Sequence, residues 1–323
     1  MPFPLMPGYD HINVVADLDP GAALRDIELG ERIRDYPKLL PAGSPDFGHA
    51  VQSGTEWRIC AAGASDPSAA RYSLAFDLRR DAAEREKDPE TARAMRAAAD
   101  RLDPEEGEQL PKDEWEIGDC RYRVIRMERF ALIGHRTMEP PRGCDDTLQG
   151  DSDPLDGYLL DPRAPVGQWE AQLRLNLVGF IALSSTAPDS IRTEARHAIL
   201  THPGILLLPP SFTVVEVKDD AWEPLTGGDR PEEARRRLAR HFGDVMPRFR
   251  EFQGDPVPPA ERAQWAEASK RIEATTDHTF TVMGREFRIL RISRMLRLGK
   301  DGPEAPRPCD QERYGLNGTA MEE

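Results

Sequence analysis

The sequence predicts an α+β fold in which a module of antiparallel sheet and helices occurs twice in tandem. Between Tyr122 and Asp145, 9 of 24 residues recur identically 165 positions later without a gap. A chain of ordinary composition would give about one or two such identities. In each half, segments with the apolar spacing of helices alternate with short runs of β-branched and aromatic residues. The repeat interval is too long for a solenoid, whose units span about 20–50 residues.

The 323 residues are enough for about two domains, each with its own core. We expect a first module at 1–150, a linker rich in Gly, Pro and Asp at 151–167, a second module at 168–310 and a flexible tail at 311–323. The modules are expected to face each other across a pseudo-twofold axis, as protomers do in symmetric dimers.

Helix starts are the clearest local signals. Asp19-Pro20 and Asp66-Pro67 each combine a capping acceptor with a proline suited to the first helical turn. The same reasoning, with the apolar spacing, predicts three helices in each half, which begin near residues 20, 67 and 89 and near residues 189, 231 and 259.

Strands are expected between these helices. The first strand of each half is placed at His11–Ala16 and at Leu173–Leu183. The last two form a hairpin, with turns at Gly118-Asp119 and Met283-Gly284. The returning segments are predicted as strand for six or seven residues, after which a helix or a bulged strand fits. A ferredoxin-like core with an added C-terminal hairpin suits this order, and the paired Trp57 and Trp222 are expected as core anchors.

Charge and composition exclude several classes of protein. The net charge of −14 argues against general affinity for nucleic acid or anionic membrane. The longest apolar run, near Leu173–Leu183, is interrupted by Arg174 and Asn176 and falls short of a membrane span. There is no secretion signal, and the four cysteines form no CxxC pair, so reduced thiols in a cytoplasm are expected.

The candidate site residues belong to the repeated segment. Arginines recur every three residues in each copy and are followed by a proline-rich loop. The candidates are Arg126 with Glu139 and Arg142 of the loop Glu-Pro-Pro-Arg, and Arg291 with Glu304 and Arg307 of the loop Glu-Ala-Pro-Arg. Prolines restrict such a loop, and a guanidinium matches a carboxylate or phosphate in shape. These arginines therefore either bind an anion or pair with the abundant acids to close each loop on its own domain.

Other chemistry has weaker support. Cys144 and Cys309 recur 165 apart and are interpreted as small buried thiols, although a cross-domain disulfide, a metal pair or a nucleophile stays open. The scattered histidines have no ligand spacing, and no nucleotide-binding or nucleophile motif is present. No metal site and no cofactor is therefore predicted.

Two phrases resemble a known family. Arg121-Tyr-Arg-Val-Ile-Arg and Gly302-Pro-Glu-Ala-Pro-Arg-Pro308 are similar to the strand and loop of an actinobacterial domain of unknown function, whose versions read Arg-Tyr-Arg-Val-Val-Arg and Gly-Pro-Glu-Pro-Pro-Arg-Pro. The first half departs from this pattern at Thr137-Met138. The resemblance implies a bacterial, cytoplasmic protein and transfers no activity.

Two functions are compatible with these observations. The first is a non-catalytic binding or protein-interaction module, with a surface for a protein partner or an anionic small molecule near the two loops. The alternative is a small-molecule enzyme with a single site between the repeats that acts on an anionic substrate. A deep cleft with convergent polar groups would favour the enzyme, and an exposed apolar patch would favour the interaction module.

Overall fold

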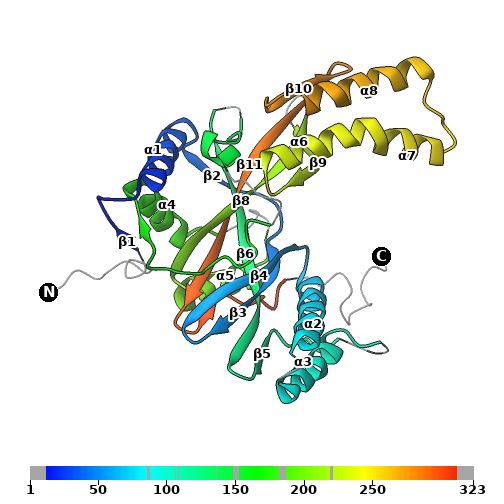
Figure 1. Cartoon of the computed structure of the whole chain (residues 1–323). Helices are drawn as coiled ribbons and strands as arrows, with labels where there is room; N and C mark the ends of the chain where they lie inside the picture. The colour runs from blue at the N-terminus through cyan, green and yellow to red at the C-terminus, as the bar shows by residue number, and fades with distance from the viewer. Residues whose placement is uncertain are drawn as a thin grey trace.

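The computed structural model describes residues 12–85, 88–105, 107, 109–135, 137–147, 153–181, 187–218 and 221–310. Within these residues the chain is an α+β protein with one large antiparallel sheet and helices packed around it (Figure 1). The tail expected at 311–323 lies outside the described residues.

The elements of the two halves follow one another in similar order. The first half contains β1 (Asn13–Val14), α1 (Pro20–Asp35), β2 (Lys38–Pro41), β3 (Asp46–Ser53), β4 (Glu56–Ala64), α2 (Pro67–Glu84), α3 (Pro89–Leu102), β5 (Glu114–Ile117), β6 (Cys120–Ile133) and the 3-10 turn η2 (Gly143–Thr147). The second contains β7 (Pro165–Val166), α4 (Gln168–Val178), α5 (Asp189–Thr201), β8 (Gly204–Lys218), β9 (Ala221–Gly228), α6 (Pro231–Arg240), the π-helical turn η3 (His241–Val245), α7 (Met246–Phe252), α8 (Pro259–Glu273), β10 (Thr279–Val282), β11 (Arg285–Gly299) and β12 (Gly302–Pro303).

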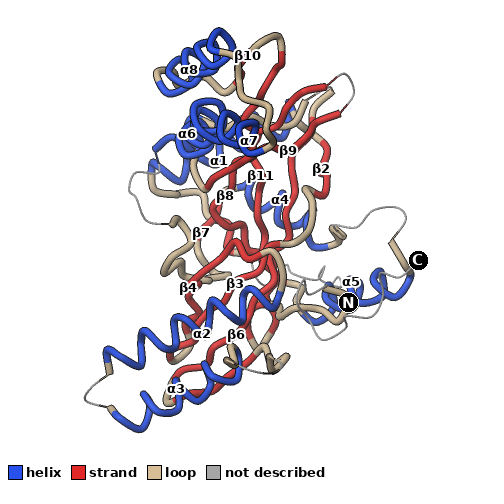
Figure 2. The backbone as a smooth tube through the Cα atoms, turned by 90° about the vertical axis from the view of Figure 1, so that its right-hand side faces the viewer, coloured by secondary structure: helices blue, strands red, loops and turns tan. Residues whose placement is uncertain are grey.

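The main sheet has the strand order β4-β3-β6-β11-β8-β9, and the shorter strands β2, β5, β10 and β12 pair with β6 or β11. Every pairing in it is antiparallel. In each half, one hairpin is followed by helices and then by a second hairpin. The ferredoxin-like expectation is therefore wrong, because that core needs a helix between the strands of each βαβ unit. The helical segments α2–α3 and α6–α8 lie at opposite ends of the sheet (Figure 2).

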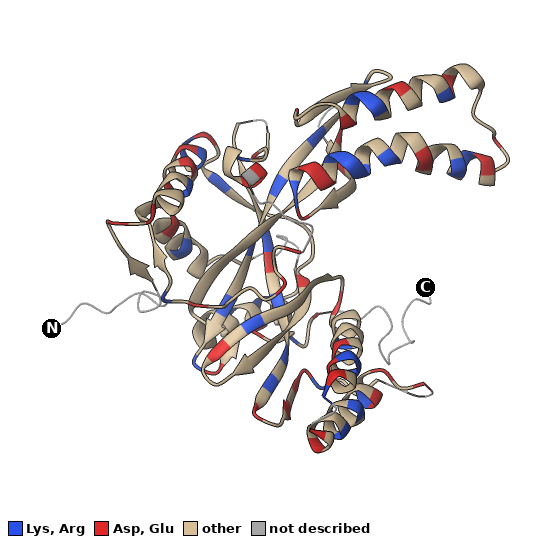
Figure 3. Ribbon diagram, in the orientation of Figure 1, with Lys and Arg blue, Asp and Glu red and all other residues tan. Residues whose placement is uncertain are grey.

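The predicted helix starts are confirmed, and their caps have the expected physical basis. The Asp19 side chain accepts a hydrogen bond from Ala22 N, and Asp66 accepts one from Ala69 N. In both helices a proline occupies the first turn, where its missing N–H costs nothing. Acidic and basic residues are intermixed along the helices at the two projecting ends of the molecule, α2–α3 and α6–α8 (Figure 3).

The strand predicted at Leu173–Leu183 is wrong, because α4 occupies Gln168–Val178. Leu173, Leu175 and Leu177 alternate with polar residues, and this alternation also fits a strand. The buried residues include Leu173, Arg174, Leu177 and Val178, which recur at the three- and four-residue spacing of a helix. The apolar pattern fits both a helix and a strand, and the packing of α4 on α1 and β8 therefore determines that the segment is helical.

The final hairpins have the predicted turns. Ile117 pairs with Cys120 and Val282 with Arg285, across two-residue turns that include Gly118 and Met283 at φ of 58° and 51°. The returning strands continue far beyond the predicted six or seven residues, to Ile133 and Gly299. The second strand has an irregular register between Ile292 and Arg294, which corresponds to the bulged alternative.

The core is divided between the two ends and the middle of the sheet. At each end, helices cover a cluster that belongs to one half, with Leu74 and Leu238 as fully buried examples. The two central clusters combine residues of both halves, and Trp57 belongs to one of them. Gly302, at φ of 123°, lies directly against the Trp57 indole. Trp57 is thus the expected core anchor, whereas Trp222 is half-buried.

The segment expected as a linker packs closely against β4. Leu155 is fully buried, Ile59 N donates to Tyr158 O at 3.0 Å, and Leu160 N donates to Trp57 O at 2.9 Å. These contacts fix the route by which the chain passes from one half to the other. None of the helices among the described residues is both long and apolar enough for a bilayer crossing.

Candidate functional site

The centre of the sheet is the junction between the two halves. There β6 and β11 run antiparallel, with Arg129 opposite Arg294 and Phe130 opposite Ser293. Arg129 and Arg294 are also the residues that occupy equivalent positions in the repeated sequence. A residue that faces its own counterpart marks the axis of an isologous contact. The junction therefore has the strand pairing of a symmetric dimer.

Two loops cross this junction in opposite directions. Residues 139–145 follow β6 but lie on β11, where Arg291 N donates to Glu139 O at 2.9 Å. Residues 304–310 follow β11 but lie on β6, where Arg126 N donates to Glu304 O at 3.0 Å. We define the first loop cluster as Glu139, Arg142, Asp145, Arg291 and Ser293, and the second loop cluster as Glu304, Arg307, Asp310, Arg126 and Glu128. The six residues predicted as site candidates all lie in these two clusters, three in each.

In the first loop cluster, Arg142 Nε donates to Glu139 Oε1 at 2.6 Å. Asp145 accepts from Arg142 N at 2.8 Å and from Arg291 Nε at 3.0 Å. Burial acts to lower the pKa of Arg142, but the Glu139 carboxylate outweighs it and raises this pKa. The arginines therefore pair with acids, and each loop bonds to the strand of the opposite half as well as to its own half.

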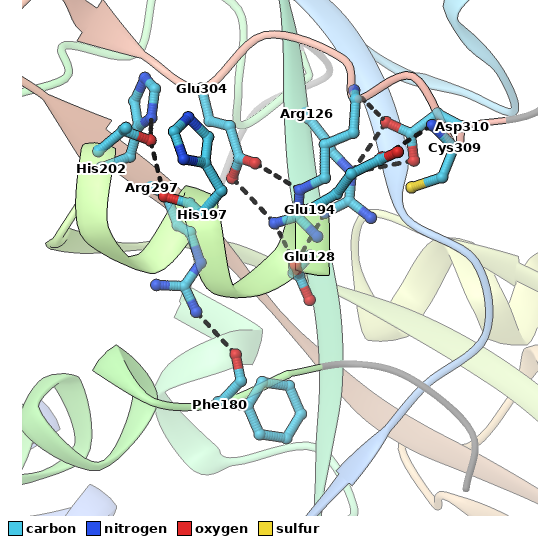
Figure 4. Close-up of polar contacts among 12 residues, drawn as sticks. Arg126, Glu128, Phe180, Glu194, His197, His202, Arg297, Glu304, Cys309 and Asp310 are labelled. Atoms are coloured by element: carbon cyan, nitrogen blue, oxygen red, sulfur yellow. Dashed lines mark hydrogen bonds and ion pairs between the residues drawn. The ribbon is translucent and has the colours of Figure 1, made fainter. Parts of the chain in front are cut away.

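The second loop cluster repeats these contacts. Arg307 Nε donates to Glu304 Oε1 at 2.6 Å, and Asp310 accepts from Arg307 N at 2.7 Å and from Arg126 Nε at 3.0 Å. Figure 4 shows Arg126 between Glu128 and Asp310. Each of these bonds has its counterpart 165 residues away in the first loop cluster.

A glutamate from a helix holds each loop by its backbone. Glu28 of α1 accepts from Gly143 N at 2.7 Å and from Cys144 N at 3.2 Å, and Glu194 of α5 accepts from Cys309 N at 2.9 Å. Burial raises the pKa of Cys144 to about 12, and Glu28 adds to the rise. The thiol is therefore protonated at neutral pH and is a poor nucleophile. The two thiols are half-buried, and they are not joined as a disulfide.

The two loop clusters differ at one position of the strand. In the second, Glu128 Oε1 accepts from Arg126 Nη1 at 2.8 Å and from Arg307 Nη2 at 2.9 Å. In the first, the equivalent residue is Ser293, whose hydroxyl accepts from Arg291 Nη1 at 2.8 Å. Within the described part of the chain, Arg142 Nη2 donates to Glu139 alone, at 3.2 Å. The first loop cluster thus has one carboxylate fewer than the second.

Burial acts to raise the pKa of Glu128, but the neighbouring guanidinium groups hold it below its usual range. Arg126, Arg307 and Arg297 supply this effect, and Arg297 replaces Leu132 of the first half. Arg297 also donates to the carbonyl groups of Val178 and Phe180, at 3.0 and 2.7 Å (Figure 4). Glu128 is therefore an ionised carboxylate inside a positively charged, buried environment.

A cavity of about 360 Å³ that opens to solvent adjoins the first loop cluster, and residues of α1, α4, β8 and β11 line it. We call it the junction cavity. Its charged lining consists of five arginines and three acids, namely Arg25, Arg142, Arg174, Arg291, Arg294, Asp26, Asp145 and Glu170. Leucines such as Leu29, Leu173 and Leu207 supply an apolar part of the wall. A net positive and partly apolar cavity favours an anionic ligand with an apolar body.

Arg174 is the distinctive group of this cavity. Its side chain is 3% exposed, and its Nη2 group pairs with Glu170. Its Nε and Nη1 groups are buried without a hydrogen-bond partner in the described part of the chain. Unsatisfied buried donors are rare in native proteins and cost about 1–3 kcal/mol. An acceptor on a bound molecule would satisfy them.

The sequence alone did not identify Arg174, Ser293 or Glu128 as site residues. A signal for Arg174 was present, since it interrupts the longest apolar run of the chain. The importance of Ser293 depends on the register of two strands and on a loop that crosses between them, neither of which a local motif encodes. Among the described residues, no group of three or more His, Cys, Asp or Glu is placed to hold a metal ion.

The fold and the site together define an α+β protein whose arginine-rich junction borders a ligand-sized cavity. The chain belongs to DUF5954, a family of unknown function, whose model matches residues 19–313. Comparison with curated proteins and with solved structures found no match.

Proposed function

We propose that this protein is a non-catalytic binding protein that holds a small anionic molecule in the junction cavity. One observation carries the proposal, namely that the buried Arg174, which lines the junction cavity together with Arg142 and Arg291, has two donor groups unpaired by any described residue. The volume of about 360 Å³ is at the lower end of the range of roughly 300–1,000 Å³ that is typical of ligand sites. The ligand is therefore of metabolite size.

The chemistry of the lining favours binding over catalysis. A guanidinium stays protonated at all ordinary pH values, so the five arginines can position and neutralise a ligand but cannot exchange protons with it. The thiol of Cys144, whose pKa burial raises to about 12, is not poised for nucleophilic attack. An enzyme that acts on an anionic substrate in the same cavity is the alternative.

The proposal is tested by a thermal-shift and calorimetric screen of small organic and inorganic anions against the wild-type protein and the Arg174→Met variant. We expect at least one anion to stabilise the wild type and to lose most of its effect in Arg174→Met. The variant itself should lose little stability, because an apolar side chain replaces the unpaired donors and the Glu170 carboxylate that loses its partner is 31% exposed to solvent. Arg248→Met, on the exposed part of α7, is the matched control.

Absence of binding by every anion, or equal binding by Arg174→Met, would overturn the proposal. Nuclear magnetic resonance of each anion that binds, after prolonged incubation with the protein, distinguishes binding from turnover. Conversion of the anion by the wild type but not by Arg174→Met would replace the binding function with the enzymatic alternative.

We also propose that the two halves arose by tandem duplication, with the module boundaries given above. Support comes from the reciprocal bonds Arg126–Asp310 and Arg291–Asp145, whose residues differ by the same 165 positions. The four free cysteines support a reducing, cytoplasmic environment.

A further inference from the structure

In the second loop cluster, a carboxylate of the chain itself is bound by two arginines. The first loop cluster has the equivalent arginines and is suited to bind the same kind of group. Glu128 presents its carboxylate to Arg126 Nη1 and Arg307 Nη2 at 2.8 and 2.9 Å. The side chain is only 3% exposed, so this carboxylate is held in an interior environment. In the second loop cluster, a carboxylate of the protein itself therefore occupies the position between the two arginines.

The first loop cluster retains the equivalent donors without the equivalent carboxylate. Arg291 and Arg142 correspond to Arg126 and Arg307, and both line the junction cavity. Ser293 is the residue equivalent to Glu128. Its side chain is shorter than that of a glutamate, so its hydroxyl does not extend to the place that a glutamate carboxylate would occupy. Its position beside the junction cavity makes this place accessible to a ligand.

We infer that the ligand is a small organic carboxylate whose carboxyl group lies between Arg142 and Arg291 above Ser293, in the position that Glu128 takes in the second loop cluster. This inference rests on the function proposed above and specifies its ligand class. Arg174 Nε and Nη1 bind a second oxygen acceptor of the same ligand, and the leucines of the cavity contact its apolar part.

The local charge favours a carboxylate over a phosphate dianion. In the first loop cluster, the charges of Arg142 and Arg291 are already matched by Glu139 and Asp145. The second loop cluster accepts a single additional negative charge at Glu128. An equivalent site therefore suits a monoanionic group, one oxygen of which accepts from both guanidinium groups as Glu128 Oε1 does.

The experiment uses the full chain with acetate and inorganic phosphate as probes, and with chloride at equal ionic strength as the reference. We expect acetate to raise the melting temperature of the wild type above the chloride value, and phosphate to raise it less. Ser293→Glu supplies the carboxylate within the chain, so it should abolish the acetate shift. Ser293→Gln, of matched size and without the charge, controls for filled volume.

A second variant tests, away from the junction cavity, whether a free carboxylate can replace the Glu128 side chain in the second loop cluster. Glu128→Ser should lower the melting temperature, and acetate should restore part of the loss beyond its effect on the wild type. Persistence of the acetate shift in Ser293→Glu, or the absence of any rescue in Glu128→Ser, would overturn the inference.

The outcomes separate this inference from the proposed function. If phosphate stabilises the wild type and acetate does not, the junction cavity binds anions but the carboxylate assignment is wrong. If neither probe nor any other anion of the screen stabilises the wild type, the proposed function itself fails.

Discussion

The second loop cluster has Glu128 where the first has Ser293, so we expect Asp145→Asn and Asp310→Asn to lower the free energy of unfolding by different amounts. Asp145 and Asp310 make the same contacts, one with Arg291 and one with Arg126, and both aspartates are about 5% exposed or less. Asp145→Asn removes the carboxylate that pairs with Arg291, which keeps the neutral Ser293 hydroxyl as an acceptor. Asp310→Asn leaves Arg126 paired with the Glu128 carboxylate at 2.8 Å.

The magnitudes follow from this difference. Breaking a buried ion pair so that one charge is left uncompensated costs about 3–5 kcal/mol. Loss of one charged hydrogen bond, when another ion pair remains, costs about 1.5–3 kcal/mol. We therefore expect Asp145→Asn to lower the free energy of unfolding by roughly 3 kcal/mol and Asp310→Asn by roughly 1.5 kcal/mol. At about 2 °C per kcal/mol for a large chain, the melting temperatures should fall by about 6 and 3 °C.

Urea unfolding, followed by both tryptophan fluorescence and circular dichroism, measures these changes in a buffer free of carboxylates. An equal cost of the two substitutions, or a larger cost for Asp310→Asn, would refute the argument that Glu128 compensates Arg126. Adding Ser293→Glu to Asp145→Asn should recover about half of the loss, since it supplies Arg291 with the missing carboxylate.

Two further predictions concern pH and packing. The pKa of Glu128 is held below its ordinary value of 4.5, so its contribution to stability is complete above pH 4.5 and is lost as the pH falls through the lower pKa of the folded state. Acid titration of the unfolding free energy should show this loss, and Glu128→Gln should lack it. Gly302→Ala would place a Cβ atom 2.7 Å from Trp57 Nε1 at φ of 123°, so it should cost about 2–4 kcal/mol in thermal unfolding. Gly54→Ala, at φ of 61° with open space around it, should cost only about 1 kcal/mol, and an equal cost for both would contradict the packing argument.

The sequence predicted the elements well where the signal was local. Asp19-Pro20, Asp66-Pro67 and the turn at Gly118 act through neighbouring residues, and the structure has helices and a hairpin at these places. The error at Leu173–Leu183 arose where helix and strand periodicity overlap and the choice depends on contacts with α1 and β8. The later part of β11 was similarly undetermined, because its pairing with β8 extends over residues remote in sequence.

The candidate site was predicted in its residues but not in its arrangement. The recurrence of arginine at an interval of 165 residues identified Arg126, Arg142, Arg291 and Arg307. That each loop crosses to the opposite strand could not be deduced, because either connection satisfies the same pairing of arginines with acids. The position that differs between the copies, Glu128 against Ser293, was hidden by a search for identity.

The register that places Arg129 opposite Arg294 has a consequence for the first half as a separate polypeptide. A chain that ended at residue 150 would leave the edge of β6 uncovered from Met127 to Phe130, and an open sheet edge recruits another strand. The same register would allow β6 of two such chains to pair antiparallel about a twofold axis, and each loop at Arg142 would reach the neighbouring copy. Joining the halves in one polypeptide converts this concentration-dependent encounter into an intramolecular one and allows the two halves to differ at a single side chain.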